Sequence, residues 1–282
     1  MKSITPYLIV FLLALSTTVN AQKWEAGIML GASNYSGDLS HQPIVLEETN
    51  FAYGVLLRYN WTSKYTLKAN FYNGQISGSD ANADSERLRN RNLHFKSHVW
   101  DFSAQVEYNI LGFDITSKHE RFSPYIFAGI SVFNFDPQAE IEIDGEMEWV
   151  RLQPLGTEGQ GTTRYNDREK YALTQIAIPF GFGVKQAIGK HWVIGAEFGW
   201  RKTFTDYLDD VSTTYVERGV LERERNGELA YRLSYRTPEV LGDDAPRVTR
   251  EDERGRSTTQ DWYMMGGITI TYTIFPRSCF RF

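Results

Sequence analysis

The sequence predicts an all-β protein: an eight-stranded antiparallel up-and-down transmembrane β-barrel with long extracellular loops. Three observations predict this fold class. Eight segments of roughly ten residues alternate apolar and polar side chains, the connections between them are short and long in turn, and an export signal precedes them all. Successive side chains of a strand point to opposite faces, so each segment has one face suited to lipid and one suited to a polar lumen.

The amino terminus resembles a secretory signal peptide. Lys2 precedes an apolar run at residues 7–15, and small residues follow up to Ala21. We therefore expect residues 1–21 to be the signal peptide and residues 22–282 to form the barrel domain. The apolar run is too short to span a membrane as a helix. The single cysteine, Cys279, excludes an internal disulfide framework.

Composition agrees with a barrel. The mean hydropathy is −0.41, because lipid-facing residues would occupy only every second position. Aromatic residues make up 14% of the chain and gather at the ends of the predicted strands, where interfacial girdles are needed. The net charge of −5 argues against nucleic acid as a partner.

The first four strands are expected near residues 24–33, 51–61, 65–71 and 100–108. Each has apolar residues at every second position, with aromatic residues at the ends. The outward residues are Trp24, Ala26, Ile28 and Leu30; Phe51, Tyr53, Val55, Leu57, Tyr59 and Trp61; Tyr65, Leu67, Ala69 and Phe71; and Trp100, Phe102, Ala104, Val106 and Tyr108.

The last four strands are expected near residues 125–133, 176–185, 192–201 and 262–273. The fifth strand has the weakest signal because both of its faces are apolar. The outward residues of the other three are Ile176, Ile178, Phe180, Phe182 and Val184; Trp192, Ile194, Ala196, Phe198 and Trp200; and Trp262, Met264, Ile268, Ile270 and Tyr272.

The connections set the topology. The shorter ones are residues 62–64, 111–122 and 187–191, and the longer ones are 34–50, 77–92, 134–172 and 205–260. Outer-membrane barrels keep short turns in the periplasm, so both ends of the chain are expected there. Asp144 and Gly145 lie between two alternating runs, which predicts a β-ribbon inside the third long loop.

The interior of an eight-stranded barrel is filled by side chains, so we do not expect an open pore. Isolated buried charges are costly, and we expect the inward charges to pair across the lumen, with an ion or proton path as the alternative. The predicted lumen charge network consists of Glu25, Arg58, Lys68, Asp101, Glu107, Lys185, Glu197 and Arg201.

No motif indicates catalysis, and we expect no catalytic, cofactor-binding or metal-binding residues. His94 and His98 would lie about 13 Å apart on one strand face, too far to share a metal. They are better suited to the lipid–water interface. Residues 80–86 imitate a calcium loop, but Ser85 replaces its glycine and Arg91 its final glutamate, which favours a solvated polar loop.

The turn at residues 111–122 is longer than a hairpin requires. It is either a tolerated insertion or a docking surface for a periplasmic partner. The candidate docking residues are Phe113, Arg121 and Phe122, because aromatic and arginine side chains are favoured interface anchors.

Four segments together resemble one family of proteins. They are residues 31–39 (GASNYSGDL), 154–161 (PLGTEGQG), 178–185 (IPFGFGVK) and 204–212 (FTDYLDDVS). In these segments the chain resembles the Bacteroidota outer-membrane barrels that include PorG of the type IX secretion system. The resemblance implies a non-enzymatic barrel in the cell outer membrane that docks a periplasmic PorK–PorN-type ring.

Two function hypotheses follow. The first is the accessory role in type IX protein secretion. The second is a stand-alone structural or surface-binding barrel whose loops contact lipopolysaccharide or external ligands. Both have outer-membrane lipids and lipopolysaccharide as neighbours, and both require the same barrel.

Overall fold

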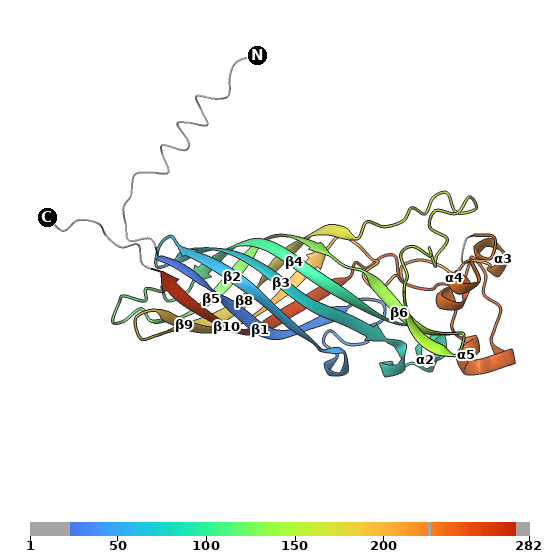
Figure 1. Cartoon of the computed structure of the whole chain (residues 1–282), viewed down its shortest axis with the longest axis horizontal. Helices are drawn as coiled ribbons and strands as arrows, with labels where there is room; N and C mark the ends of the chain where they lie inside the picture. The colour runs from blue at the N-terminus through green and yellow to red at the C-terminus, as the bar shows by residue number, and fades with distance from the viewer. Residues whose placement is uncertain (1–22, 225–226, 275–282) are drawn as a thin grey trace, which may run out of the picture.

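The computed structural model describes residues 23–224 and 227–274. The expected signal peptide and Cys279 lie outside these residues. Ten strands form one antiparallel sheet, and eight of them close into a barrel (Figure 1). The barrel strands are β1 (Lys23–Ser36), β2 (Asn50–Asn60), β3 (Tyr65–Ser79), β4 (His94–Asn109), β5 (Phe122–Asn134), β8 (Thr174–Ile188), β9 (Trp192–Thr203) and β10 (Trp262–Ile274).

The barrel closes between its first and last strands. β1 pairs with β10 from Trp24 opposite Ile274 to Ser36 opposite Trp262, while β3 and β4 complete the ring on the other side. Every neighbouring pair is antiparallel, and each short or long connection joins adjacent strands. The predicted eight-stranded up-and-down barrel is therefore confirmed.

The two faces of the barrel differ as the alternation predicts. Outward residues are exposed and apolar, such as Leu57 at 41% and Phe102 at 55%, whereas inward residues are buried and largely polar. Exposed aromatic residues ring the end that carries the short turns: Trp24, Trp61, Tyr65, Tyr108, Trp192 and Tyr272. Phe51, Tyr53 and Trp100 are exposed at the opposite end. We call these the turn end and the loop end.

The fifth strand is apolar on both faces, as the sequence indicated, because its inward Tyr125, Phe127 and Phe133 are buried and fill the lumen. The burial of Met264 departs from the sequence expectation. Met264 keeps its outward register beside Trp200 but is only 2% exposed. The side chain of Asn34, its register partner on β1, donates to the carbonyl of Val45, so the following loop covers this part of the outer wall.

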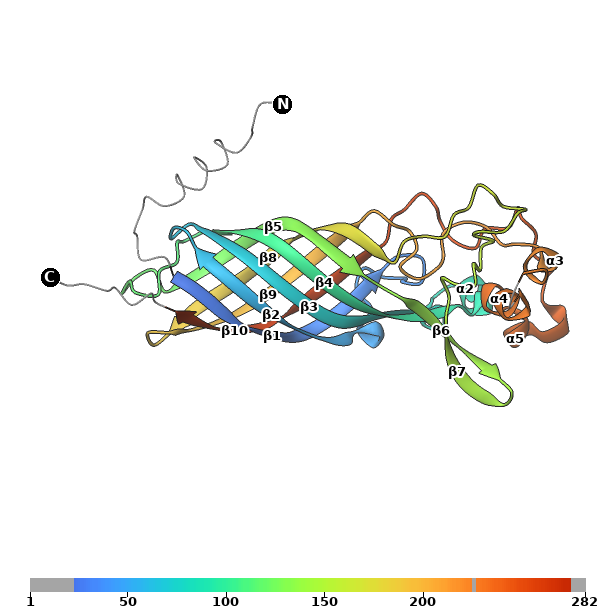
Figure 2. The same ribbon diagram turned by 45° about the horizontal axis from the view of Figure 1, so that its top comes forward.

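The predicted ribbon is present. β6 (Pro137–Ile143) and β7 (Glu146–Arg151) form a hairpin joined by Asp144 and Gly145, whose φ angles of 53° and 87° are those of a tight hairpin turn. The ribbon continues the sheet from β4 and projects sideways from the loop end (Figure 2).

The long loops form a folded cap beyond the loop end, in which lie the helices (Figure 1). This loop cap contains η1 (Leu46–Glu48), η2 (Asp80–Asn82), α2 (Glu86–Arg91), α3 (Arg218–Leu221), α4 (Gly227–Ser234), α5 (Pro238–Leu241) and η3 (Gly242–Asp244). It has small apolar cores of its own, one of them joining β6 to Leu233 of α4. Among the described residues, no helix is long and apolar enough to cross a membrane.

Candidate functional site

The eight predicted lumen charges lie inside the barrel, and each is at most 6% exposed. Arg58 is central: its Nε donates to Glu107 at 2.9 Å, and its other nitrogens lie 3.3 Å from Glu197 and 3.9 Å from Glu25. Lys68 and Lys185 lie 3.0 Å from Glu197 and 2.9 Å from Glu107. Further toward the loop end, Arg201 lies 3.9 Å from Asp101.

Tyrosines and phenylalanines complete the lumen network. Tyr72 and Tyr125 donate their hydroxyl groups to Glu197 at 2.7 and 2.8 Å. The ammonium of Lys68 lies 4.3 Å from the ring centre of Phe127. Four cations and four carboxylates are thus packed against aromatic rings, which leaves the interior filled with paired charge.

The turn end corrects one expectation. Phe113 is only 3% exposed and packs with Ile115, Ala187 and Val193, so it is not an exposed docking anchor. Its ring lies 4.9 Å from the ammonium of Lys185, and it therefore fills the lumen beneath the charge network. The length of the turn is explained by this plug, and replacing residues 112–121 by a tight turn would remove it.

The other two candidate docking residues differ from each other. Arg121 donates to the carbonyls of Ile115, Ala187 and Gly189, so it ties the two turns together. Phe122 is 45% exposed at the start of β5. Between the turns lies a cavity of about 610 Å³ whose charged lining residues are Lys118, Arg121 and Lys190.

The remaining polar motifs have structural partners. His94 accepts from the backbone N–H of Glu140 at 3.1 Å, and burial together with Arg236 lowers the pKa of His94 to about 4. His98 is exposed on β4. Asp80 is fully buried rather than solvated, and Arg91 binds it through two bonds of 2.7 Å. The described residues contain no group of three or more side chains suited to a metal.

A second buried polar cluster, which the sequence analysis did not single out, joins the loops of the cap. Tyr35 at the end of β1 donates to Asp209 at 2.6 Å and lies 3.3 Å from Asp261. Asp210 accepts from Thr157 and from Tyr171. We call the carboxylates Asp38, Glu158, Asp209, Asp210 and Asp261, with Arg254, the cap cluster.

Glu158 holds the longest loops together. It accepts from the backbone N–H groups of Ser212 and Thr213 at 2.9 and 3.0 Å, and Arg254 donates to it at 3.0 Å. Three of the four segments that carry the family resemblance therefore meet here, from residues 31–39, 154–161 and 204–212. Acidic residues in three separate loops were the sequence signal, but their convergence is a property of the fold.

Burial changes the acidity of this cluster. Desolvation raises the pKa of Asp210 to about 6, although Arg254 opposes the shift. Desolvation and neighbouring carboxylates raise the pKa of Asp209 and of Asp261 well above the usual range. Asp209, Asp210 and Asp261 therefore hold protons more readily than exposed carboxyl groups do.

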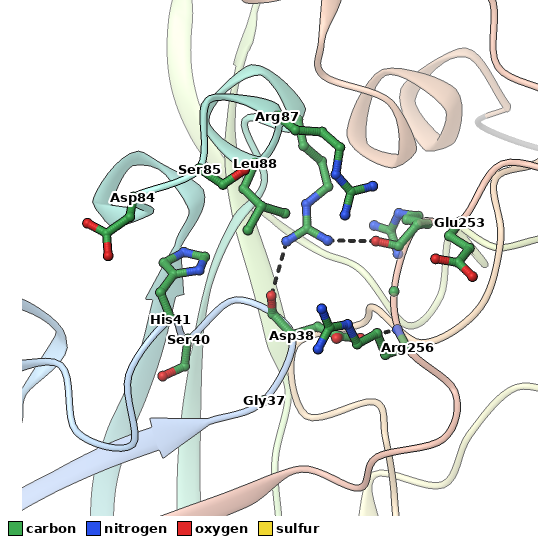
Figure 3. A pocket seen from close by; sticks show the side chains of 13 residues that line it. Gly37, Asp38, Ser40, His41, Asp84, Ser85, Arg87, Leu88, Glu253 and Arg256 are labelled. Carbon is green, nitrogen blue, oxygen red and sulfur yellow. Dashed lines mark hydrogen bonds between the residues drawn. The ribbon is translucent and has the colours of Figure 1, made fainter.

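A cavity of about 340 Å³ lies beside the cap cluster (Figure 3). Its walls come from three loops, which contribute Asp38 and His41, then Asp84 and Arg87, then Glu253 and Arg256. Arg91 crosses between these loops, donating to the carbonyls of Arg254 and Asp38 at 2.6 and 3.1 Å. The cavity thus has a floor made by hydrogen bonds between its own loops.

A closed eight-stranded barrel with an apolar outer wall, exposed aromatic residues at both ends and an ion-paired lumen is a transmembrane barrel of the outer-membrane type, a protein of the cell outer membrane. The family model of DUF6089, a domain of unknown function, matches residues 4–149 and 158–230. The chain belongs to that family.

The chain also matches solved structures of other bacterial proteins at low similarity. OprG from Pseudomonas aeruginosa has a TM-score of 0.41 and 8% identity, with 91% of this chain and 97% of that chain covered. Ail, the attachment invasion locus protein of Yersinia pestis, has a TM-score of 0.40 and 9% identity, with 90% of this chain and 100% of that chain covered. Neisserial surface protein A has a TM-score of 0.38 and 8% identity, with 90% of this chain and 98% of that chain covered. No curated protein matches the chain.

Proposed function

We propose that this protein is a sealed, non-enzymatic outer-membrane barrel that acts by presenting its loop cap as a binding surface outside the cell. The observation that carries the proposal is the contrast between a filled lumen and a cavity-bearing cap. Arg58, Glu107 and Phe113 occupy the barrel interior, whereas the cap keeps a charged cavity of about 340 Å³. Function through a surface follows from this arrangement more directly than transport does.

Conductance tests the sealed lumen. The purified full chain in a planar lipid bilayer should give no current steps, while an open porin in the same bilayer should give them. Regular ohmic steps from the wild-type protein would overturn the proposal.

The orientation is tested on intact cells. In a Cys279→Ser background, Val240→Cys places a thiol in the cap and Lys118→Cys places one at the turn end, and both native side chains are exposed. A membrane-impermeant maleimide should label position 240 but not position 118. Labelling of position 118 alone would contradict a cap that faces outward.

The second candidate function is the accessory role in type IX secretion, with the turn end docking a PorK–PorN-type ring. The family resemblance supports it, and so does the cavity between the two turns. Lys118, Arg121 and Lys190 give that cavity a positive lining with no acidic residue among the side chains that form it. An acidic partner segment would be complementary to this lining.

Co-purification tests the second candidate. In cells that contain the ring, the double variant Lys118→Glu with Lys190→Glu should lose the ring, while Arg223→Glu on the exposed cap should retain it. If the wild-type protein does not co-purify with the ring, the accessory role is wrong. If the double variant retains the ring at normal yield, the docking site lies elsewhere.

A further inference from the structure

The charged cavity of the cap adjoins a second one across a shared wall. The neighbouring cavity of about 490 Å³ shares the wall residues Arg87, Leu88, Arg91 and Glu253 with the first. Tyr215 and Tyr235 line the second cavity, together with apolar groups such as Pro246. The two cavities therefore lie side by side along this shared wall, and one is charged while the other is partly aromatic. We call the two together the cap cleft.

The floor of the cap cleft is fixed by arginines whose donors are already used. Arg91 is bound to Asp80 through two bonds of 2.7 Å. Arg254 binds Glu158 and the carbonyls of Ser234 and Asp210. These bonds join three loops, so the cleft exists before any ligand arrives, which lowers the cost of ordering on binding.

Other donors on the walls of the cleft are not used in this way. Arg87 and Arg256 are exposed, and among the described residues their guanidinium groups form no hydrogen bond or close ion pair; Arg256 donates only its backbone N–H, to Asp38 at 2.8 Å. The Nε2 atom of His41 is buried and has no hydrogen-bond partner within residues 23–224 and 227–274. Figure 3 shows Arg87, His41 and Arg256 around the cavity, each from a different loop.

The walls also carry acceptors. The carboxylates of Asp84 and Glu253 are exposed on opposite sides of the cavity (Figure 3). A ligand that suits both kinds of group must offer an anionic group to the arginines and several hydroxyl donors to the carboxylates. The tyrosine-lined half adds an apolar wall for the carbon face of a ring.

We propose that the cap cleft binds an acidic saccharide, with its carboxylate or phosphate against Arg87 and Arg256 and its hydroxyl groups against Asp84 and Glu253. This inference rests on the proposed surface-binding role, because it requires a cap that faces outward. The same chemistry has two sources there: the lipopolysaccharide of the protein's own membrane, and acidic glycans from outside.

Binding by the full chain in detergent micelles tests the inference, measured by calorimetry with three probes. They are a deacylated lipopolysaccharide core oligosaccharide, an oligogalacturonate and a neutral dextran oligosaccharide. At least one acidic probe should bind, and dextran should not. If the core oligosaccharide binds more tightly, the ligand is the lipopolysaccharide of the protein's own membrane. If oligogalacturonate binds more tightly, the ligand is an external glycan.

Variants locate the site. Arg87→Gln and Arg256→Gln should each weaken binding of the acidic probe about tenfold, since each removes a charge-assisted contact. Arg223→Gln, an exposed cap arginine outside the cleft, should bind within about twofold of the wild type. Unchanged affinity in both cleft variants would overturn the inference, as would equal binding of dextran.

An oligoglutamate peptide distinguishes failure of the saccharide inference from failure of the surface-binding role. If this peptide binds and neither acidic saccharide does, the saccharide inference is wrong and the surface-binding role remains. If the wild-type protein conducts ions in the bilayer, the role itself is wrong.

Discussion

The lumen and the cap both bury charged side chains, but they balance them differently. In the lumen, Arg58, Lys68, Lys185 and Arg201 face an equal number of carboxylates, and each charge has an opposite one within 4.0 Å. In the cap cluster, five carboxylates gather around one arginine, Arg254, which lies 3.0 Å from Glu158 and 3.8 Å from Asp210.

The difference separates a permanent part of the molecule from an adjustable one. Because the buried charges of the lumen are paired, the stability of the barrel should depend little on pH. Asp209 and Asp261 share the hydroxyl of Tyr35 without any cation at ion-pair distance among the described residues. Their energy therefore depends on protonation. The cap is the region whose stability can respond to pH.

The largest expected effect comes from unbalancing the lumen. Glu107→Gln removes the carboxylate that lies within 3.4 Å of Arg58, Lys68 and Lys185, so three buried cations are left to share the others. Breaking such a buried pair costs about 3–5 kcal/mol. Urea unfolding of the barrel in micelles measures this loss.

A double variant provides the matched control. Glu107→Gln combined with Lys185→Met removes one charge of each sign from the network, and it should recover part of the lost stability. If Glu107→Gln alone unfolds at the wild-type urea concentration, the lumen charges do not stabilise the barrel.

The next effect compares exposed apolar residues of the barrel wall and of the cap. Leu57 is 41% exposed and faces lipid at mid-strand, so Leu57→Arg should cost about 2–4 kcal/mol. Val240 is 49% exposed on α5 of the cap, and Val240→Arg should change stability by about 0.5 kcal/mol or less. Equal costs would contradict a lipid-facing barrel wall.

The third prediction concerns pH. Because burial raises the pKa of Asp210 to about 6 and that of Asp206 to about 7, the folded cap holds protons that an unfolded loop has lost above its usual carboxyl pKa of about 4. Stability of the cap should therefore fall as pH rises from about 4 to 7. Hydrogen exchange of residues 205–216 should show higher protection factors at pH 5 than at pH 8.

A neutral variant checks the cause of this dependence. In the wild type, Asp261 accepts a hydrogen bond from the backbone N–H of Leu208 at 2.9 Å. Asp261→Asn retains an oxygen for this bond but removes one charge from the cap cluster. Its protection at pH 8 should rise toward the value at pH 5. An unaltered pH profile in this variant would show that the carboxylate cluster is not the responsive element.

The barrel could be predicted from the sequence because every second residue of a strand faces lipid and must therefore be apolar. Leu57, Phe102 and Ile194 follow this rule whatever their neighbours in space are. The hairpin at Asp144 and Gly145 was equally readable, since a tight turn needs residues that tolerate positive φ.

The cap was not readable in the same way. The structure of the cap depends on contacts between residues far apart in the chain, such as Tyr35 with Asp209 and Glu158 with Arg254. No periodic sequence pattern predicts such contacts. The turn at residues 111–122 misled for a related reason. Phe113 had the character of an exposed anchor, but only the barrel geometry shows that it closes the lumen.

The smallest predicted effect compares two glycines in equivalent local settings. Gly145 in the ribbon has φ of 87°, Gly189 in the turn between β8 and β9 has φ of 63°, and an added Cβ at either position would meet nothing within 4 Å. Alanine should therefore cost only the backbone strain, about 1 kcal/mol, at both sites.

The measurement that detects this cost should differ between the ribbon and the barrel. Gly145→Ala should raise exchange of ribbon amides at residues 138–151 about fivefold and leave barrel unfolding unchanged, because the ribbon lies outside the closed ring of eight strands. Gly189→Ala should instead lower the urea midpoint of the whole barrel, since closure makes its strands unfold together. If Gly145→Ala also lowers the barrel midpoint, the cap and the barrel are one cooperative unit, and their division into a permanent and an adjustable part is wrong.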